Sequence, residues 1–315
     1  MKLRSIHLII ILMSFINLSA QQKNYTAGYY TIKIGTSIVT ALLDGTVPVD
    51  ANRLLISDDE HQIDTLLEEA YINNPVETSI NAYLIKTNNR LILIDAGAGE
   101  LFKDPASGNL LESMSNAGYR PDQITDILLT HIHVDHSGGL TVKGSMQFPN
   151  AIIHLDKKEI DFWQQHEKPD KDEPRGYTSN RPAFLTLKPY LEKGNVKTFE
   201  GGSQLFPGIR SVPYYGHTFG HCAFVLESDN EKLVFFGDLV HIGAVQFHAP
   251  LLANEFDFDK IKAAEQRKKI YSEASEENYL IAADHIPFPG LGRLKNIEDD
   301  YKWIPVNFSS TGKTK

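Results

Sequence analysis

The sequence predicts an α/β protein in which two layered sheets form one domain. Strand-like and helix-like segments alternate along most of the chain. The 315 residues include 42% hydrophobic and 23% charged residues, which are ordinary values for a folded protein. The chain has no repeat of fixed period and no obvious linker, so residues 21–315 are expected to form a single domain.

The first half of the chain is predicted to open with antiparallel strands. Asn88 and Asn89 suit a hairpin turn between the last two of these strands. A helix over 110–117 is expected to end at Gly118, and an apolar strand over 124–130 leads directly into His131. The opening strands are predicted at 30–34, 37–43, 79–86 and 91–94.

The second half begins with a predicted helix through residue 166, because Asp156 and Glu159 have the spacing of a capping box. Residues 167–182 are rich in proline and charge, which predicts an irregular segment, either a mobile flap or a solvated surface insertion. The remaining predictions are strands at 196–199, 209–213, 223–227 and 232–236, a helix at about 257–275, and a last strand at 279–283.

The first 20 residues have the pattern of a secretory signal peptide. Lys2 and Arg4 precede an apolar run over 8–16, and the small residue Ala20 suits cleavage. The run is shorter than the roughly 20 residues that span a bilayer. The alternative is an N-terminal anchor that stays attached. We expect a periplasmic or secreted protein without stable membrane insertion.

Charge and cysteine content exclude several classes of protein. The 31 lysine and arginine residues against 40 acidic residues give a net charge of -9, which is the wrong sign for binding nucleic acid. Cys222 is the only cysteine, so an intramolecular disulfide and a zinc ribbon are both impossible. Any metal ion must therefore be bound by histidine and carboxylate side chains.

Three of the twelve histidines lie within six residues, in the segment 131–136. His131 and His133 are two residues apart, so they point the same way from an extended segment and can bind one ion. Asp135 and His136 then reach a second ion, and the glycines at 138 and 139 allow a tight turn below them. The alternative is a histidine-rich surface loop that arose by chance.

Three later strand ends offer further ligands. His217 and His221 flank one turn, Asp238 follows a second apolar strand, and His285 follows a third. A single histidine at a strand end is more often structural than a metal ligand. The joint pattern favours a metal site.

These motifs, in this order, resemble the metallo-β-lactamase superfamily. The resemblance implies a four-layer αβ/βα sandwich with two divalent metal ions, zinc by default, between the sheets. The implied ligands are His131, His133 and His217 for the first ion, Asp135, His136 and His285 for the second, and Asp238 bridging both.

The same resemblance assigns residues behind the ligands. Asp95 belongs to a strand-end Asp-x-Gly and would orient a ligand histidine as an acceptor, and His221 would act likewise. Asp238 stands where zinc β-lactamases commonly use cysteine, so antibiotic hydrolysis is disfavoured.

Six further segments resemble methyl parathion hydrolase and related lactonases. This likeness implies an exported homodimer with an aromatic pocket that includes Phe102 and Trp163, although either side chain could instead belong to the core. His241 occupies the position of a tyrosine in several lactonases, and it either donates to the substrate carbonyl or is a bystander. The segments are 75–79, 148–151, 161–163, 244–247, 285–290 and 306–307.

The predicted activity is hydrolysis by a hydroxide that bridges two metal ions, with Asp135 carrying the proton. The favoured reaction is ring opening of N-acyl homoserine lactones, which would quench quorum signals. One alternative is a phosphotriesterase of the methyl parathion hydrolase type. The other is a catalytically silent metal-binding or ligand-binding protein. The expected partner is a small-molecule ester or lactone.

Overall fold

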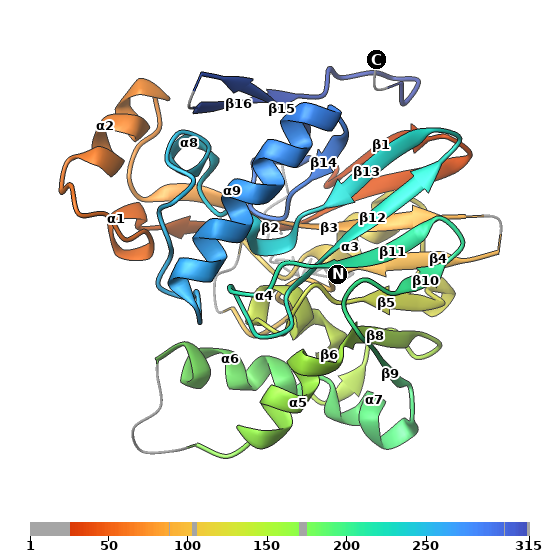
Figure 1. The fold of residues 1–315 in the computed structure, drawn as a ribbon. Helices are drawn as coiled ribbons and strands as arrows, with labels where there is room; N and C mark the ends of the chain where they lie inside the picture. The colour runs from red at the N-terminus through yellow and green to blue at the C-terminus, as the bar shows by residue number, and fades with distance from the viewer. Residues whose placement is uncertain (1–25, 88, 103–105, 170–174, 299, 314–315) are drawn as a thin grey trace, which may run out of the picture.

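The computed structural model describes residues 26–313, except 88, 103–105, 170–174 and 299. Two seven-stranded sheets face each other, and helices cover their outer faces (Figure 1). The predicted four-layer αβ/βα sandwich is confirmed. The predicted signal peptide lies outside the described residues and stays a prediction. Among the described residues, no helix has the length and apolar character needed to cross a bilayer.

The first sheet has the order β1-β2-β3-β4-β5-β8-β9. Its opening strands pair antiparallel, as predicted, and β4, β5, β8 and β9 pair in parallel. Parallel strands end at one edge of a sheet, so Asp95 after β4 lies near His131 after β5. The strands are β1 (Tyr29–Ile34), β2 (Ser37–Val49), β3 (Val76–Lys86), β4 (Leu91–Ile94), β5 (Asp126–Leu128), β8 (Ile152–Asp156) and β9 (Val196–Phe199).

The second sheet runs in chain order from β10 to β16. Its parallel pair, β13 and β14, brings Asp238 and His285 to the same edge. The strand predicted at 279–283 is β14, but two further strands, β15 and β16, follow it. The sequence does not predict these two strands, because many of their residues are exposed and they carry little hydrophobic pattern. The strands are β10 (Gln204–Phe206), β11 (Ile209–Pro213), β12 (Cys222–Ser228), β13 (Glu231–Phe235), β14 (Leu280–Ala282), β15 (Leu291–Ile297) and β16 (Asp300–Pro305).

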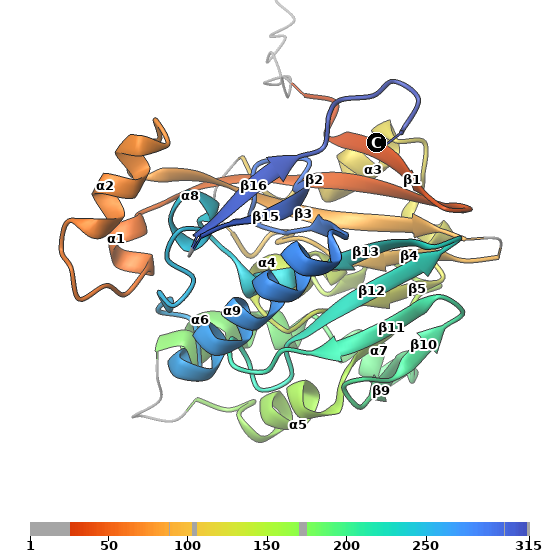
Figure 2. The same cartoon turned by 45° about the horizontal axis from the view of Figure 1, so that its top comes forward.

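Nine α-helices are described, and the longest, α9, lies against the outer face of the second sheet (Figure 2). A short hairpin, β6 (Thr141–Val142) and β7 (Ser145–Met146), stands apart from both large sheets. The helices are α1 (Ala51–Leu54), α2 (Gln62–Glu69), α3 (Leu110–Asn116), α4 (Val134–Ser137), α5 (Lys157–Gln165), α6 (Arg175–Leu185), α7 (Lys188–Lys193), α8 (Gly243–Gln246) and α9 (Lys260–Glu277).

Alternation along the strands of the first sheet places apolar side chains in two cores, one on each face of that sheet. In β4, Ile92 and Ile94 point between the sheets toward Phe224 and Phe235, while Leu91 and Leu93 point outward to the layer of α3 and α5. This period of two is what a strand buried on both faces requires. Cys222 is fully buried, as expected for a small apolar residue in this setting.

The prediction of an irregular segment over 167–182 is wrong for its second part. Residues 175–182 belong to α6, with Pro182 inside the helix. Just beyond the proline, Ala183, Phe184 and Leu187 are buried in the outer core of the first sheet. Burial of this apolar cluster outweighs the local preference of proline against a helix interior.

Candidate metal centre

The turns after five strands meet at one edge of the sandwich. They carry Asp95, His131, His217, Asp238 and His285, and all five side chains are at most 6% exposed. The turn after His136 packs tightly beneath them, because a Cβ on Gly139 would lie 2.0 Å from the carbonyl oxygen of Ala96. Glycine at this position therefore lets the two loops approach, as the sequence predicts.

The first predicted ligand group is assembled. His131, His133, His217 and Asp238 offer ligand atoms within 4.8 Å of one another. Asp238 Oδ2 lies 3.6 Å from His131 Nε2 and 3.1 Å from His217 Nε2. His133 Nδ1 lies 3.1 Å from the same nitrogen of His217.

The second predicted group is assembled around the other oxygen of Asp238. Asp238 Oδ1 lies 2.9 Å from His136 Nε2 and 3.1 Å from His285 Nε2. Asp135 Oδ2 lies 3.5 Å from His285 Nε2. The two oxygens of one carboxylate thus face two separate groups, which is the arrangement of a bridging ligand.

The side chains fit a pair of divalent cations. His131 Nε2 and His133 Nε2 are buried and make no hydrogen bond to any described residue. Buried polar atoms without a partner are costly, and a metal ion would satisfy both. Neutral imidazole and carboxylate are the ligands that zinc and similar ions prefer.

Four of the histidines use their second ring nitrogen to contact a supporting group. Such contacts orient each ring so that the opposite nitrogen faces the cluster. Asp257 lies in no recognisable motif, and segment 75–79 gave no role for the backbone of Ser79, so the sequence predicted neither contact. The pairs are His131 Nδ1 with Thr130 Oγ1 at 3.0 Å, His136 Nδ1 with Asp95 Oδ2 at 2.8 Å, His217 Nδ1 with Asp257 Oδ1 at 2.8 Å, and His285 Nδ1 with the Ser79 carbonyl oxygen at 2.9 Å.

Asp95 ties two loops together besides holding His136. Its carboxylate accepts hydrogen bonds from the backbone N–H and the hydroxyl of Thr130, at 2.8 and 2.7 Å. The backbone of Asp95 has a φ of 58°, a left-handed conformation that a non-glycine residue adopts only when its surroundings enforce it. These bonds hold the strained turn in place.

His221 positions the bridging aspartate and not, as predicted, a ligand histidine. Its Nε2 accepts a hydrogen bond from the backbone N–H of Asp238 at 3.1 Å, and its Nδ1 donates to the carbonyl oxygen of Tyr214 at 3.3 Å. Burial lowers the pKa of His221 to about 3. The ring therefore stays neutral and keeps this tautomer at physiological pH.

Glu159 departs from the predicted capping box. Asp156 caps α5 through the Lys158 N–H at 2.8 Å, as expected, but the Glu159 carboxylate points into the core. It accepts hydrogen bonds from the Ile132 N–H at 2.9 Å and the Thr218 hydroxyl at 2.7 Å. The Gly220 N–H and Trp163 Nε1 complete the set at 2.9 and 3.2 Å. One buried carboxylate thus joins the segment of His131 and His133 to the turn of His217.

An apolar cavity of about 240 Å³ opens over the ligand cluster. Phe102 and His241 line this cavity, as predicted for the substrate pocket. Trp163 does not, because its indole is fully buried in the outer core of the first sheet. Its predicted pocket role is therefore corrected to a core role. Other lining residues include Val47, Val49, Leu54, Leu101, Asp135, Asn180 and Phe256.

His241 is held in one tautomer by Asn254. The Asn254 amide oxygen accepts from the Phe256 N–H at 2.7 Å, which leaves its amide nitrogen to donate to His241 Nδ1 at 3.2 Å. His241 Nε2 therefore carries the proton and lies 3.0 Å from Asp238 Oδ2. His241 therefore contacts the carboxylate of Asp238.

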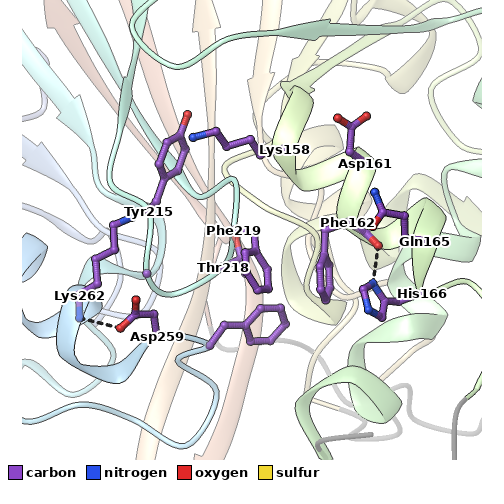
Figure 3. Close-up of a pocket in the computed structure, with 12 residues that line it drawn as sticks. Lys158, Asp161, Phe162, Gln165, His166, Tyr215, Thr218, Phe219, Asp259 and Lys262 are labelled. Atoms are coloured by element: carbon purple, nitrogen blue, oxygen red, sulfur yellow. Dashed lines mark hydrogen bonds between the residues drawn. The ribbon is translucent and has the colours of Figure 1, made fainter.

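A larger cavity, of about 620 Å³, lies on the outer side of the His217 turn (Figure 3). Phe162 and Phe219 stack there with ring centroids 4.5 Å apart, and the Lys158 ammonium sits 4.0 Å from the Tyr215 ring centroid. None of the predicted metal ligands lines this cavity, so it is separate from the cluster.

Four buried groups at the cluster have raised pKa values: contacts with Asp238 raise the pKa of His136 against the effect of burial, and the pKa values of His217, His285 and Asp284 are raised as well. Burial opposes charge on His217 and His285, but their contacts with Asp238 outweigh it and raise both pKa values to about 9. Burial raises the pKa of Asp284, which lies 3.3 Å from His136 Nδ1, to about 8.

The metal-free protein is therefore expected to lose stability as pH rises from 6.5 to 9. His217 and His285 bind protons more tightly in the folded state, so their contribution is complete below pH 6.5 and disappears by about pH 9. Asp284 also stabilises the folded state less as pH rises toward 8, because its carboxyl group binds a proton more tightly in the folded protein than in the unfolded chain. The loss should be on the order of 1–3 kcal/mol in total, since the histidines share one partner. Thermal melts of chelator-treated protein across this range measure it.

Zinc-loaded protein is the control for this prediction. Zinc requires deprotonated imidazoles, so its stabilising effect should grow over the same pH range. A metal-free protein whose melting temperature rises with pH would contradict the prediction.

The fold and the assembled ligand set define a metal-dependent hydrolase with positions for two ions. The family model described as the metallo-beta-lactamase superfamily matches residues 75–285. The chain belongs to this superfamily.

Solved structures extend the likeness over most of the chain. The structure described as hydrolase AbOPH in the beta lactamase superfamily is 36% identical, with a TM-score of 0.85, and the match covers 91% of this chain and all of that one. The dizinc quorum-quenching lactonase AidC, in complex with a product, is 30% identical, with a TM-score of 0.81, over 90% of this chain and 99% of that one.

An N-acyl homoserine lactonase of Bacillus cereus is 27% identical over 179 residues. That match covers 51% of this chain and 63% of the lactonase, so this chain spans less than two thirds of the relative's length. Together the comparisons relate the chain to lactonases and to metal-dependent ester hydrolysis.

Proposed function

We propose that this protein opens the ring of N-acyl homoserine lactones. The observation that carries the proposal is the apolar cavity whose floor includes Asp135, Asp238 and His285. An amphipathic lactone could place its acyl chain against the apolar walls and its carbonyl carbon over the ligand cluster. The similarity to AidC and to the Bacillus lactonase supports this substrate class.

Two bound divalent ions, which we propose to be zinc, would lower the pKa of water and polarise the substrate oxygen. Side chains of the protein would carry the proton, exclude water and contact the substrate carbonyl. Asp135 is 17% exposed and lies 3.5 Å from His285, so its carboxylate can accept a proton and return it to the leaving oxygen. Leu54 and Phe102 exclude water from the acyl chain. His241 Nε2–H can turn from Asp238 to the substrate carbonyl.

A phosphotriesterase would use the same ligand set, and a silent binding protein would keep the ligands without turnover. Steady-state assays of zinc-loaded protein on N-decanoyl-homoserine lactone and on methyl parathion separate these functions. We expect kcat/KM for the lactone to exceed that for the triester by at least about 100-fold, and chelation to abolish both. A faster triester reaction would reverse the ranking, and metal-independent or absent turnover would reject hydrolysis at this site.

We also propose export through a cleaved segment 1–20 and assembly as a homodimer. Cell fractionation with N-terminal sequencing tests the first proposal. Light scattering of the purified protein tests the second, and a monomer at micromolar concentration would contradict it.

A further inference from the structure

The cavity of about 620 Å³ on the outer side of the His217 turn is built from three segments of the chain (Figure 3). Residues of α5 line one side, residues 215–219 line the middle, and the start of α9 lines the other side. Its volume lies within the range of about 300 to 1,000 Å³ that small-molecule sites occupy. A ligand bound there would lie outside the metal centre, because the cavity includes no predicted metal ligand.

One part of this cavity presents a stack of aromatic rings. His166, Phe162 and Phe219 follow one another, with ring centroids 4.2 and 4.5 Å apart. Phe258 packs against them, 5.3 Å from Phe162 and 5.4 Å from Phe219. Phe219 nevertheless remains 46% exposed. An acyl chain that covered the stack would remove this ring from water, which favours binding.

The other part of the cavity carries concentrated positive charge. The ammonium groups of Lys158 and Lys262 lie 4.0 and 5.6 Å from the centroid of the same ring, that of Tyr215. The ring is fixed in turn, because the Tyr215 hydroxyl donates to Asp156 at 3.0 Å. Two cations therefore meet at one end of the cavity.

The acidic residues of the cavity do not neutralise these two lysines. Asp161 pairs with Lys157 at 2.5 Å. Asp259 caps α9 by accepting the backbone N–H of Lys262 at 3.0 Å. Among the residues that the structure describes, neither Lys158 nor Lys262 forms an ion pair with a carboxylate. Their ammonium groups can therefore receive an anionic group of a ligand.

We propose that this cavity binds an amphipathic carboxylate, with its acyl chain on the aromatic stack and its carboxylate at the ammonium groups of Lys158 and Lys262. The apolar stack selects the chain, and the two cations select the head group. The site is separate from the metal centre, so the proposal goes beyond lactone opening and stands without it.

Isothermal titration of the zinc-loaded protein with sodium decanoate and with 1-decanol tests the head group. Lys158→Gln combined with Lys262→Gln should raise the Kd for decanoate about 3- to 10-fold and leave the Kd for decanol within about twofold, because only the carboxylate uses the ammonium groups. Both lysines are exposed, so a thermal melt should show an intact fold. Equal affinity of the wild type for decanoate and decanol would reject recognition of a carboxylate.

Two exposed phenylalanines locate the bound chain. Phe219 lines the outer cavity and not the one over the metal ligands, whereas the reverse holds for Phe256, which is 39% exposed. Phe219→Ala should raise the Kd for decanoate about 5- to 10-fold, and the matched Phe256→Ala should leave it within about twofold. The opposite pattern would place decanoate at the metal centre and overturn the proposal.

Light scattering of Phe219→Ala completes the test. We expect the same oligomeric state as in the wild type. If the variant is a monomer and the wild type a dimer, a second copy of the chain covers the cavity and the small-ligand site is rejected. Failure of the protein to open lactones would change none of these binding results, so the two proposals fail separately.

Discussion

Asp135→Asn is expected to lower kcat for lactone opening by about 10²- to 10⁴-fold, the usual contribution of a positioned proton carrier. Asp135 is the most exposed of the seven predicted ligands, and it faces the cavity where substrate would lie. Asparagine keeps the size of the side chain and one oxygen, so most of the bound metal should remain. Metal content per chain and kcat measured on the same sample check the prediction.

His285→Ala is the comparison variant for Asp135→Asn. It removes a nitrogen of the second ligand group, so rate and metal should fall together. If Asp135→Asn holds two ions and retains nearly wild-type kcat, Asp135 is not the proton carrier. If the kcat of Asp135→Asn recovers in proportion to added metal, the role of Asp135 is metal ligation alone.

Glu159→Gln is expected to destabilise the protein by about 1–3 kcal/mol and to weaken binding of the first metal ion. Glutamine has one acceptor oxygen, whereas four donors converge on the two oxygens of Glu159. Its amide nitrogen would face an N–H or hydroxyl donor in a site that is only 1% exposed. Denaturant unfolding and zinc titration of the metal-free protein measure the two effects.

The matched control is Asp161→Asn on the same helix. Asp161 pairs with Lys157 at 2.5 Å near the surface, so its loss should change stability by less than about 1 kcal/mol. The cobalt-loaded protein offers a readout specific to positioning, because its absorption spectrum reports ligand geometry. A Glu159→Gln variant with an unchanged spectrum and unchanged zinc affinity would show that the carboxylate stabilises only the fold.

The metal ligands could be predicted because their signal is local. His131 and His133 lie two residues apart on an extended segment, and this spacing places both on one side without any knowledge of the tertiary fold. Asp238 and His285 each follow a short apolar strand, which a run of hydrophobic residues reveals. The sequence therefore predicts that the histidines and carboxylates at these strand ends form one metal site.

The supporting groups could not be predicted in this way. Asp257 and Asn254 lie in a loop with no motif, and they become relevant only because that loop packs against the His217 turn. Glu159 matched a capping box, yet a buried cluster of donors competed for its carboxylate and prevailed. Trp163 matched a pocket aromatic, yet its indole packs in the core and donates to Glu159.

The amino-acid sequence by itself determined most of the strands along the chain and the ligand motifs at their ends, since hydrophobic periodicity and residue spacing are properties of neighbours along the chain. The tertiary structure alone decided that Pro182 lies in a helix and that the two oxygens of Asp238 face separate groups. Each of these depends on contacts between segments far apart in the sequence. Their energies come from burial and from convergent hydrogen bonds, which no local pattern encodes.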